Sequence, residues 1–236
     1  RKHRPNIIFH CNFQIKIEES MNSYPITKNS KIKRIAEKAT YDTETIHQII
    51  DEALFCHIGI IHNDRPVVIP TIHARMNDHL MFHGSNASRL IKTSDQNDIC
   101  VTITLLDGLV IGRSHFHHSM NYRSVVLFGK GEIIKDHEER MDAFHAISHH
   151  FAPGRWNDAR KPNESELKQT AILKMKIDSA SAKISNKFST DEDEDYKLNY
   201  WAGIIPVNQT YGIPENDPHL KEGIILPEYL KNFKRN

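Results

Sequence analysis

Hydrophobic residues recur at helical spacing in two stretches of the chain. Between residues 42 and 54 they occupy positions 46, 49, 50, 53 and 54, which lie on one face of a helix, and Asp42 or Thr43 is available to cap it. In 137–151 a second stripe is formed by Met141, Phe144, Ile147 and Phe151. Both stretches are therefore predicted to be amphipathic helices.

Elsewhere the apolar positions follow the spacing of β-strands. Residues 55–84 contain β-rich runs separated by the polar turns HNDRP and MNDH, a pattern typical of a meander. Pro70 in this segment is expected on a sheet edge or at a bulge, because proline cannot donate to a ladder. Four later segments are predicted to contain further strands, namely 98–112, 123–135, 166–185 and 201–209.

Between the meander and the next strand, the stretch NASRLIKTS is predicted to be a short helix. Asn86 or Ser85 can cap it, and Leu90 and Ile91 give it a small apolar face. A parallel sheet would need more crossover helices than this pattern offers. We therefore predict an α+β fold built on a mostly antiparallel sheet, with closure into a barrel as its expected form.

Residues 21–236 are expected to form a single domain. Residues 1–20 lack an initiating methionine, the apolar core of a signal peptide and a small-residue cleavage site, whereas Met21 opens a segment that continues smoothly into the first helix. Residues 1–20 are therefore expected to be a non-native or disordered extension. A genuine strand or arm in NIIFHCNFQIKI is the alternative.

Charge and cysteine content limit the class of partner. Lys and Arg total 31 against 30 for Asp and Glu, so no strong field attracts nucleic acid or a membrane surface, and no apolar run approaches the ~20 residues that span a bilayer. Cys11, Cys56 and Cys100 share no metal-binding or disulfide spacing. We therefore expect a cytoplasmic protein with a small-molecule or protein partner. The acidic run 191–195 is predicted to be a solvated loop.

The stretch SHFHHSMNYRS is dense in potential ligands. In an extended chain His115 and His117 point to one face and His118 to the other, so at most two of them could share a metal ion. A third ligand would have to come from elsewhere in the chain. The same alternation separates Ser119 from His118 and disfavours a nucleophile–base pair. A metal site is therefore the weaker interpretation of this stretch.

The stretch LMFHGSNASRLIK combines groups that suit an anion. Gly84 lets the backbone approach closely, Ser85 and Ser88 offer hydroxyls, and Arg89 supplies a guanidinium. Together they predict a phosphate site. The alternative is a capped helix with a surface arginine.

The two tryptophans offer planar surfaces. Trp156 in PGRW and Trp201 in NYWAG could each close over a planar ligand. The alternative, which is the commoner fate of tryptophan, is a core or interface residue.

Several segments in this order resemble the pyridoxamine-5'-phosphate-oxidase-like flavoproteins, and more narrowly their flavin-nucleotide-binding and nitroimidazole-resistance-related branch. The segments are YDTETIHQIIDEALFCHIGI, VVIPTIHARM, HGSNASRLI, LLDGLVIGRSHFHHSMNYRSVVLFGKG, PGRW, SAKIS and WAGIIPV. The resemblance runs from about Ile35 to Pro227. It implies a split β-barrel with flanking helices that forms a homodimer, with FMN bound at the subunit interface.

The resemblance also assigns site residues position by position. The family's strand beside the isoalloxazine ring matches Val68, Ile69, Pro70, Thr71 and His73. Its turn that takes the FMN phosphate matches His83, Gly84, Ser85, Ser88 and Arg89, in agreement with the anion site predicted above. Residues expected to reach, line or cover the flavin are Asn121, Arg123, Ser124 and Trp201.

His117, His118, Ser119 and Asn121 are expected to line the flavin or substrate side of the barrel. Among them His118 is expected to donate a proton to a substrate that is being reduced, because histidine titrates near neutral pH.

The sequence departs from the true oxidase in two places. Leu90 follows Arg89 where the oxidase has a lysine, and its C-terminal Arg-x-His-Asp-Arg motif has no counterpart. Oxidation of pyridoxamine phosphate is therefore not expected.

The leading expectation is an FMN-dependent oxidoreductase that acts on an unidentified small-molecule redox substrate, with nitro compounds as one class that the resemblance suggests. FAD is an alternative to FMN. A flavin carrier or sensor without turnover is a second possibility. A haem-binding split-barrel protein, with His73, His83 or His118 as axial ligand, is a third.

Overall fold

The structure is a computed structural model that describes residues 22–234 of the 236-residue chain. Residues 1–20 and the possible strand in NIIFHCNFQIKI lie outside the described residues.

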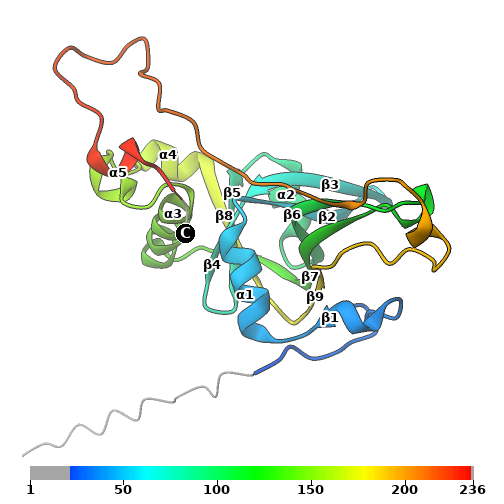
Figure 1. Cartoon of the computed structure of the whole chain (residues 1–236). Coiled ribbons are helices and arrows are strands. Elements are labelled where there is room, and N and C mark those ends of the chain that lie inside the picture. The colour runs from blue at the N-terminus through cyan, green and yellow to red at the C-terminus, as the bar shows by residue number, and fades with distance from the viewer. Residues whose placement is uncertain (1–21, 235–236) are drawn as a thin grey trace, which may run out of the picture.

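A largely antiparallel ten-stranded sheet forms the centre of the molecule (Figure 1). Its main path runs β3-β2-β6-β7-β8-β5-β4, while β10 pairs with β6, and β9 pairs with both β7 and β1. Within residues 22–234 this path does not close on itself, so the fold is a split barrel and the closed form expected from the strand pattern alone is wrong. The strands are β1 (Ala39–Thr40), β2 (Phe55–His62), β3 (Arg65–Ile72), β4 (Ala74–Met76), β5 (His79–Ser85), β6 (Asp98–Ile111), β7 (Ser119–Ile133), β8 (Thr170–Lys176), β9 (Ser179–Ser185) and β10 (Gly203–Pro206).

The strands predicted in 55–84 are present, but the predicted meander is wrong, because they form two separate hairpins, β2–β3 and β4–β5, at opposite ends of the sheet path. Pro70 therefore lies on an edge strand, as expected from its missing N–H. A turn with positive φ at Asn63 and Asp64 joins β2 to β3, which suits residues that tolerate the left-handed region.

Strand β7 connects the two halves of the sheet. Its first part pairs with β9 from Tyr122 to Phe128, and its last residues pair with β8 from Gly131 to Ile133. Glycine is required at this transition because a Cβ on Gly129 would lie 2.0 Å from the backbone oxygen of Lys176. The long hairpin of β6 and β7 then projects to the end of the sheet where it meets β10.

Helices flank the sheet and begin at side-chain caps. In α1 (Thr43–Glu52) the carboxylate of Asp42 accepts from the N–H of Thr45 at 2.7 Å, which confirms the predicted helix. In α2 (Arg89–Ser94) the cap is Ser88, so the prediction of Asn86 or Ser85 is wrong by a few residues. The remaining helices are α3 (His137–Phe151), α4 (Glu164–Gln169), α5 (Glu228–Lys231), and the 3₁₀ turns η1 (Ala36–Lys38), η2 (His115–His117), η3 (Arg155–Asp158) and η4 (Asp195–Lys197).

Two details of the helices differ from the sequence predictions. The buried positions of α3 are Ala143 and Ile147, whereas Phe151 at its end is 51% exposed. Residues 166–185 contain the predicted strands as β8 and β9, but their first residues belong to α4, which was not predicted and is held by a capping box between Asn163 and Glu166.

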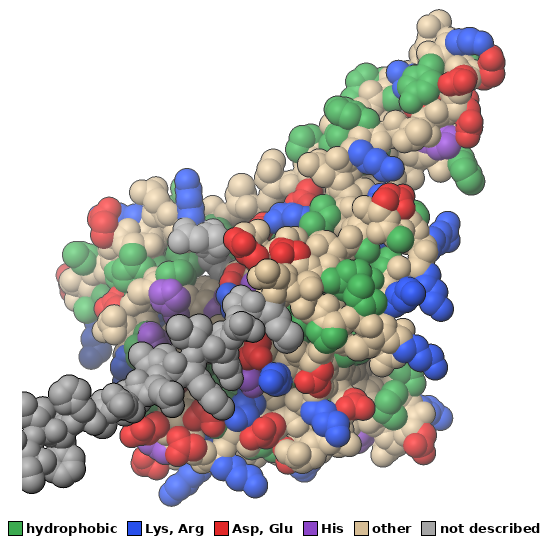
Figure 2. Space-filling view, turned by 90° about the horizontal axis from the view of Figure 1, so that it is seen from below, with side chains coloured by type: hydrophobic (Ala, Val, Ile, Leu, Met, Phe, Trp, Pro, Cys, Tyr) green, Lys and Arg blue, Asp and Glu red, His purple; other side chains and the backbone are tan. Residues whose placement is uncertain are grey.

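The surface carries both signs of charge. Figure 2 shows acidic and basic side chains interspersed over the face seen from below, in keeping with the formal net charge of +1. None of the described helices has the length and apolarity needed to cross a membrane.

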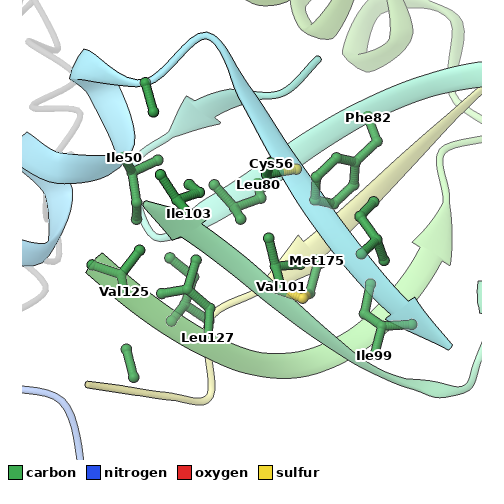
Figure 3. Packing of buried hydrophobic residues seen from close by; sticks show 14 of the residues in the cluster. Ile50, Cys56, Leu80, Phe82, Ile99, Val101, Ile103, Val125, Leu127 and Met175 are labelled. Carbon is green, nitrogen blue, oxygen red and sulfur yellow. The ribbon is translucent and has the colours of Figure 1, made fainter. Parts of the chain in front are cut away.

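The main core lies between α1 and the inner face of the strands (Figure 3). Ile46 and Ile50 of α1 are fully buried there, as is Phe82 of β5. A second, smaller cluster joins Ala143 and Ile147 of α3 to β4, β5 and β8. Burial of these apolar side chains, at about 25 cal/mol per Å², is the dominant stabilising term and fixes α1 and α3 on the sheet.

Candidate functional site

The edge strand β3 carries the first group of predicted residues. Val68 is 64% exposed and Pro70 is also exposed, while Ile69 and Thr71 are half-buried against β2. Because β3 pairs with β2 alone along the sheet path, its other edge is available to a ligand or a second chain.

His73 follows β3 and is fully buried. Its Nε2 lies 2.9 Å from the backbone oxygen of Ile50, and the Nε2 of His150 lies 2.8 Å from the backbone oxygen of Ala53. Carbonyl oxygens only accept, so both rings carry a proton on Nε2 and hold the C-terminal end of α1. The role of His150 was not anticipated, because this contact spans 97 residues of chain.

The turn from β5 into α2 carries the second group. Ser88 Oγ accepts from the N–H of Ile91 at 3.3 Å, and Ser85 Oγ accepts from the N–H of Ala87 at 3.2 Å. Gly84 is packed closely, since a Cβ there would lie 3.3 Å from Ile91 Cγ1. Both hydroxyls thus serve the backbone, as the capped-helix alternative requires. Arg89 is exposed and forms no ion pair with any residue between 22 and 234.

A mostly apolar pocket of about 370 Å³ lies between α3 and the sheet. We call it the α3 pocket; its walls include Ile72, His83, Phe144, Ile147, Phe151 and Trp156. Ile72 at the end of β3 and His83 of β5 line it, whereas Val68 to Thr71 and the rest of the turn do not. The His83 side chain is exposed at the pocket, and its partial desolvation lowers its pKa and favours the neutral imidazole. Trp156 therefore lies at a cavity, with the Lys161 ammonium 3.9 Å from its ring centroid.

A second pocket, of about 380 Å³, lies at the tip of the β6–β7 hairpin. His117, His118, Ser119 and Asn121 all line it, so the structure brings these four sequence-predicted residues together. We call it the hairpin pocket. The chain is not extended at 115–117, which forms η2. No group of three or more His, Cys, Asp or Glu side chains within residues 22–234 is placed to hold a metal ion.

Two hydrogen bonds fix the orientation of side chains in the hairpin pocket. His118 Nδ1 accepts from the N–H of Gly112 at 3.1 Å, so its neutral ring carries the proton on Nε2. Asn121 Oδ1 accepts from the N–H of Lys187 at 3.0 Å, which leaves its amide nitrogen as the donor.

Arg123 is held by two carboxylates. Its guanidinium donates to Asp107 at 3.0 and 2.8 Å and also to both oxygens of Glu52, and these hydrogen bonds raise its pKa well above the usual range. Ser124 Oγ donates to the backbone oxygen of Lys183 at 3.4 Å. In this structure Arg123 joins the end of α1 to β6.

The single chain does not bring all the predicted residues together. Pro70 pairs with His57, His57 with Thr102, and Thr102 with Val126, so Pro70 and Val126 lie at one level of the sheet. Asn121 precedes Val126 by five residues on β7. At roughly 3.4 Å per residue, the two residues are about 17 Å apart along the strand. Trp201 is 66% exposed beside Gly203 and lines neither pocket.

The sequence was compared with known families and curated proteins. A family model described as pyridoxamine 5'-phosphate oxidase matches residues 42–184. No curated protein matches the chain.

Many solved structures resemble the chain, including the following three. The flavocytochrome Anf3 from Azotobacter vinelandii is 35% identical, over 89% of this chain and 98% of that chain, with a TM-score of 0.84. The FAD and heme binding protein from Mycobacterium smegmatis is 32% identical, over 81% and 94%, with a TM-score of 0.77. A putative 5-nitroimidazole antibiotic resistance protein from Bacteroides thetaiotaomicron is 26% identical, over 62% and 86%, with a TM-score of 0.53.

Proposed function

Because the chain belongs to the pyridoxamine 5'-phosphate oxidase family, we propose that it binds a flavin nucleotide and transfers electrons to a small-molecule substrate. The names of two relatives that share about a third of its sequence, a flavocytochrome and an FAD and heme binding protein, support this proposal. The second of these names also favours FAD over FMN as the nucleotide. The free cysteines Cys56 and Cys100 are consistent with a reducing, cytoplasmic compartment.

One structural observation carries the proposal. Ile72, the last residue of β3, and His83 of β5 both line the α3 pocket, and β5 leads after His83 into the turn that carries Arg89, which forms no ion pair with any residue between 22 and 234. In the proposal, the isoalloxazine ring lies along β3 from Val68 to Thr71, and the phosphate is bound by Arg89. A guanidinium without a carboxylate partner is suited to a phosphate, because its planar donors match two phosphate oxygens.

A homodimer completes the proposed site. Leu109 of β6 pairs with Met120 of β7 on one side and with Ile205 of β10 on the other, and all three side chains are exposed by 42 to 49%. Such a row of apolar side chains across three strands suits a protein interface. A second copy would also bring the hairpin residues of one chain to the β3 edge of the other, which a single chain does not do.

When bound, the flavin would supply the redox chemistry. The chain would orient it with the β3 backbone, hold its phosphate with Arg89, and exclude water with the apolar side chains at the interface. Arg123, clamped by Glu52 and Asp107, would keep α1 and β6 in register beneath the site. His118 would direct its Nε2–H at the substrate and, once protonated to the imidazolium, which breaks the Gly112 hydrogen bond, would give one proton to the reduced substrate and return to the neutral ring; unchanged turnover in His118→Gln would remove that role.

Haem binding is a second candidate, favoured by the α3 pocket. Its aromatic and aliphatic walls suit a porphyrin, and a neutral His83 imidazole suits iron. Of the three histidines considered from the sequence, His73 donates Nε2 to Ile50 and His118 lies at the hairpin pocket, whereas His83 lines the apolar pocket. Arg160 lines the same pocket, but its guanidinium is already paired with both carboxylate oxygens of Glu166, which a propionate would have to displace.

Replacement of Arg89 tests the flavin site. Loss of one charge-assisted hydrogen-bonding group costs about 1.5–3 kcal/mol, so Arg89→Ala is expected to weaken FMN and FAD binding by roughly 10- to 100-fold. Fluorescence titration of the apoprotein measures this directly. Lys92→Ala is the matched control, because Lys92 is an exposed cation one turn further along α2. If Arg89→Ala and Lys92→Ala bind FMN and FAD with equal affinity, the placement of the phosphate on Arg89 is refuted.

A further inference from the structure

The hairpin pocket has features that the proposed flavin site does not explain. Figure 1 shows η1, the tip of the β6–β7 hairpin and the segment after β9 gathered at one end of the molecule. Its volume of about 380 Å³ falls within the range of small-molecule sites. The group of residues around it combines cations, a buried amide and exposed aromatic rings.

Four cations surround the pocket without carboxylate partners. Arg34 and Lys187 line it, Lys38 Nζ donates to Ser185 Oγ at 2.9 Å, and Lys183 Nζ donates to the backbone oxygen of Arg34 at 3.2 Å. None of the four forms an ion pair with another residue of the described part of the chain. Burial and the charges of Lys187 and Lys183 lower the pKa of Lys38. The cluster is therefore electrostatically unsatisfied and favours an anion.

Three acidic groups lie nearby, and none forms an ion pair with the four cations. The exposed Glu37 raises the pKa of Lys38 but does not outweigh burial, Lys187 and Lys183. Asp191 is bound by Arg113 at 3.1 Å. Glu192 lies 3.8 Å from His117 and is 80% exposed, so it offsets little of the positive charge over the pocket.

Asn121 provides a directional donor. The residue is 4% exposed and lines the pocket, and the N–H of Lys187 occupies its Oδ1. No residue between 22 and 234 accepts a hydrogen bond from its Nδ2, and this atom is not among the fully buried unpaired ones, so it is accessible. The Asn121 amide can therefore donate to a ligand oxygen in the pocket.

Two phenylalanines line the pocket and are largely exposed. Phe116 is 87% exposed and Phe188 is 69% exposed. Exposed aromatic rings beside a cationic cluster match a ligand that has a flat ring and a phosphate, because a planar base stacks favourably on an aromatic side chain. Ile35, with φ 56° and ψ 56°, turns the chain between Arg34 and Lys38.

We propose that the hairpin pocket binds an adenosine phosphate, with the phosphate on Arg34, Lys38 and Lys187, the Asn121 amide on an oxygen, and the adenine against Phe116 and Phe188. The choice of a nucleotide rests on the proposed flavin function. The same chemistry has two sources, namely the adenosine diphosphate half of FAD or a free nucleotide that donates electrons.

The double variant Arg34→Ala/Lys187→Ala tests this proposal, with Lys130→Ala as control, since Lys130 is an exposed cation of β7 that lies outside the pocket. Both target side chains are exposed, so folding should be preserved. ADP binding to the full-length apoprotein is measured by calorimetry, and FAD and FMN affinities by fluorescence. The proposal expects ADP affinity to fall at least tenfold in the double variant and to remain unchanged in the control.

The two sources give different results. If the pocket holds the adenosine half of FAD, the double variant loses FAD affinity but not FMN affinity, and ADP competes with FAD. If it holds a free nucleotide, ADP binds the flavin-loaded protein and both flavin affinities are unchanged. Equal ADP and FAD affinities in wild type and double variant overturn the proposal. Failure of the flavin site is distinguished from this, because it would abolish FMN binding while ADP binding persists.

Phe116→Ala/Phe188→Ala provides a second test that leaves the charges intact. It should weaken ADP while leaving inorganic pyrophosphate binding unchanged. Equal ADP affinity in this variant and in wild type would contradict the stacked position of the ring.

Discussion

Asp191 is buried although it belongs to an acidic run, and its partner Arg113 lies 78 residues earlier in the chain. One carboxylate oxygen accepts from the N–H of Arg113 at 3.0 Å and the other from its guanidinium at 3.1 Å. Burial raises the pKa of Asp191, but hydrogen bonds from Arg113 and Ser189 outweigh it and hold the pKa below the ordinary value. The predicted solvated loop is therefore wrong at its first residue.

This contact predicts a pH dependence of stability. A carboxyl whose pKa is lower in the folded state stabilises the fold above its unfolded pKa of about 3.9, and this contribution is lost as the pH falls through the folded pKa. Asp191→Asn is therefore expected to lower the thermal midpoint at pH 7 and to flatten its decline below about pH 4. Thermal unfolding followed by circular dichroism across this range measures both effects.

Asp193→Asn is the matched control, because Asp193 lies in the same run but is exposed and forms no ion pair with any residue between 22 and 234. A wild-type pH profile that persists in Asp191→Asn would show that the Arg113 contact does not stabilise the fold.

At the scale of elements, β7 changes its partner strand from β9 to β8, and this change requires glycine at position 129. A Cβ on Gly129 would lie 2.0 Å from the backbone oxygen of Lys176, and backbone cannot move aside as a flexible side chain can. A Cβ on Gly59 of β2 would lie 3.5 Å from its nearest neighbour, which is ordinary contact. Gly59→Ala can therefore serve as the control for Gly129→Ala.

Gly129→Ala is expected to destabilise the protein by about 1–3 kcal/mol or more, because the added methyl group forces β7 and β8 apart. Gly59→Ala should change the free energy of unfolding by less than about 1 kcal/mol. Urea unfolding of both variants measures the difference. Similar stability of the two would mean that the sheet adjusts easily at this transition.

The elements with a strong local signal were predictable from the sequence. The spacing of Ile46, Ile49 and Ile50 predicts α1. The residues His117, His118, Ser119 and Asn121 line one pocket because they are close neighbours in the chain. The contact of Arg113 with Asp191 and that of His150 with Ala53 were not predictable, because the fold alone brings these residues together. α4 was missed although Asn163 and Glu166 carry a capping signal.

At the scale of the whole molecule, the candidate site is divided between two regions of one chain. The β3 edge and Arg89 lie near the α3 pocket, while His118 and Asn121 lie at the tip of the hairpin. A homodimer would join the two regions and cover the row of Leu109, Met120 and Ile205. Sedimentation equilibrium should therefore give twice the chain mass of 27.3 kDa. A flavin-loaded monomer would contradict the shared site.

The most direct test of the account is the absorption spectrum of the purified protein, followed by mass spectrometry of the small molecule released on denaturation. The account predicts a flavin spectrum and release of FAD or FMN, with a Soret band in addition where haem occupies the α3 pocket. A protein that neither contains a flavin nor binds one when FMN or FAD is added would contradict the proposed function.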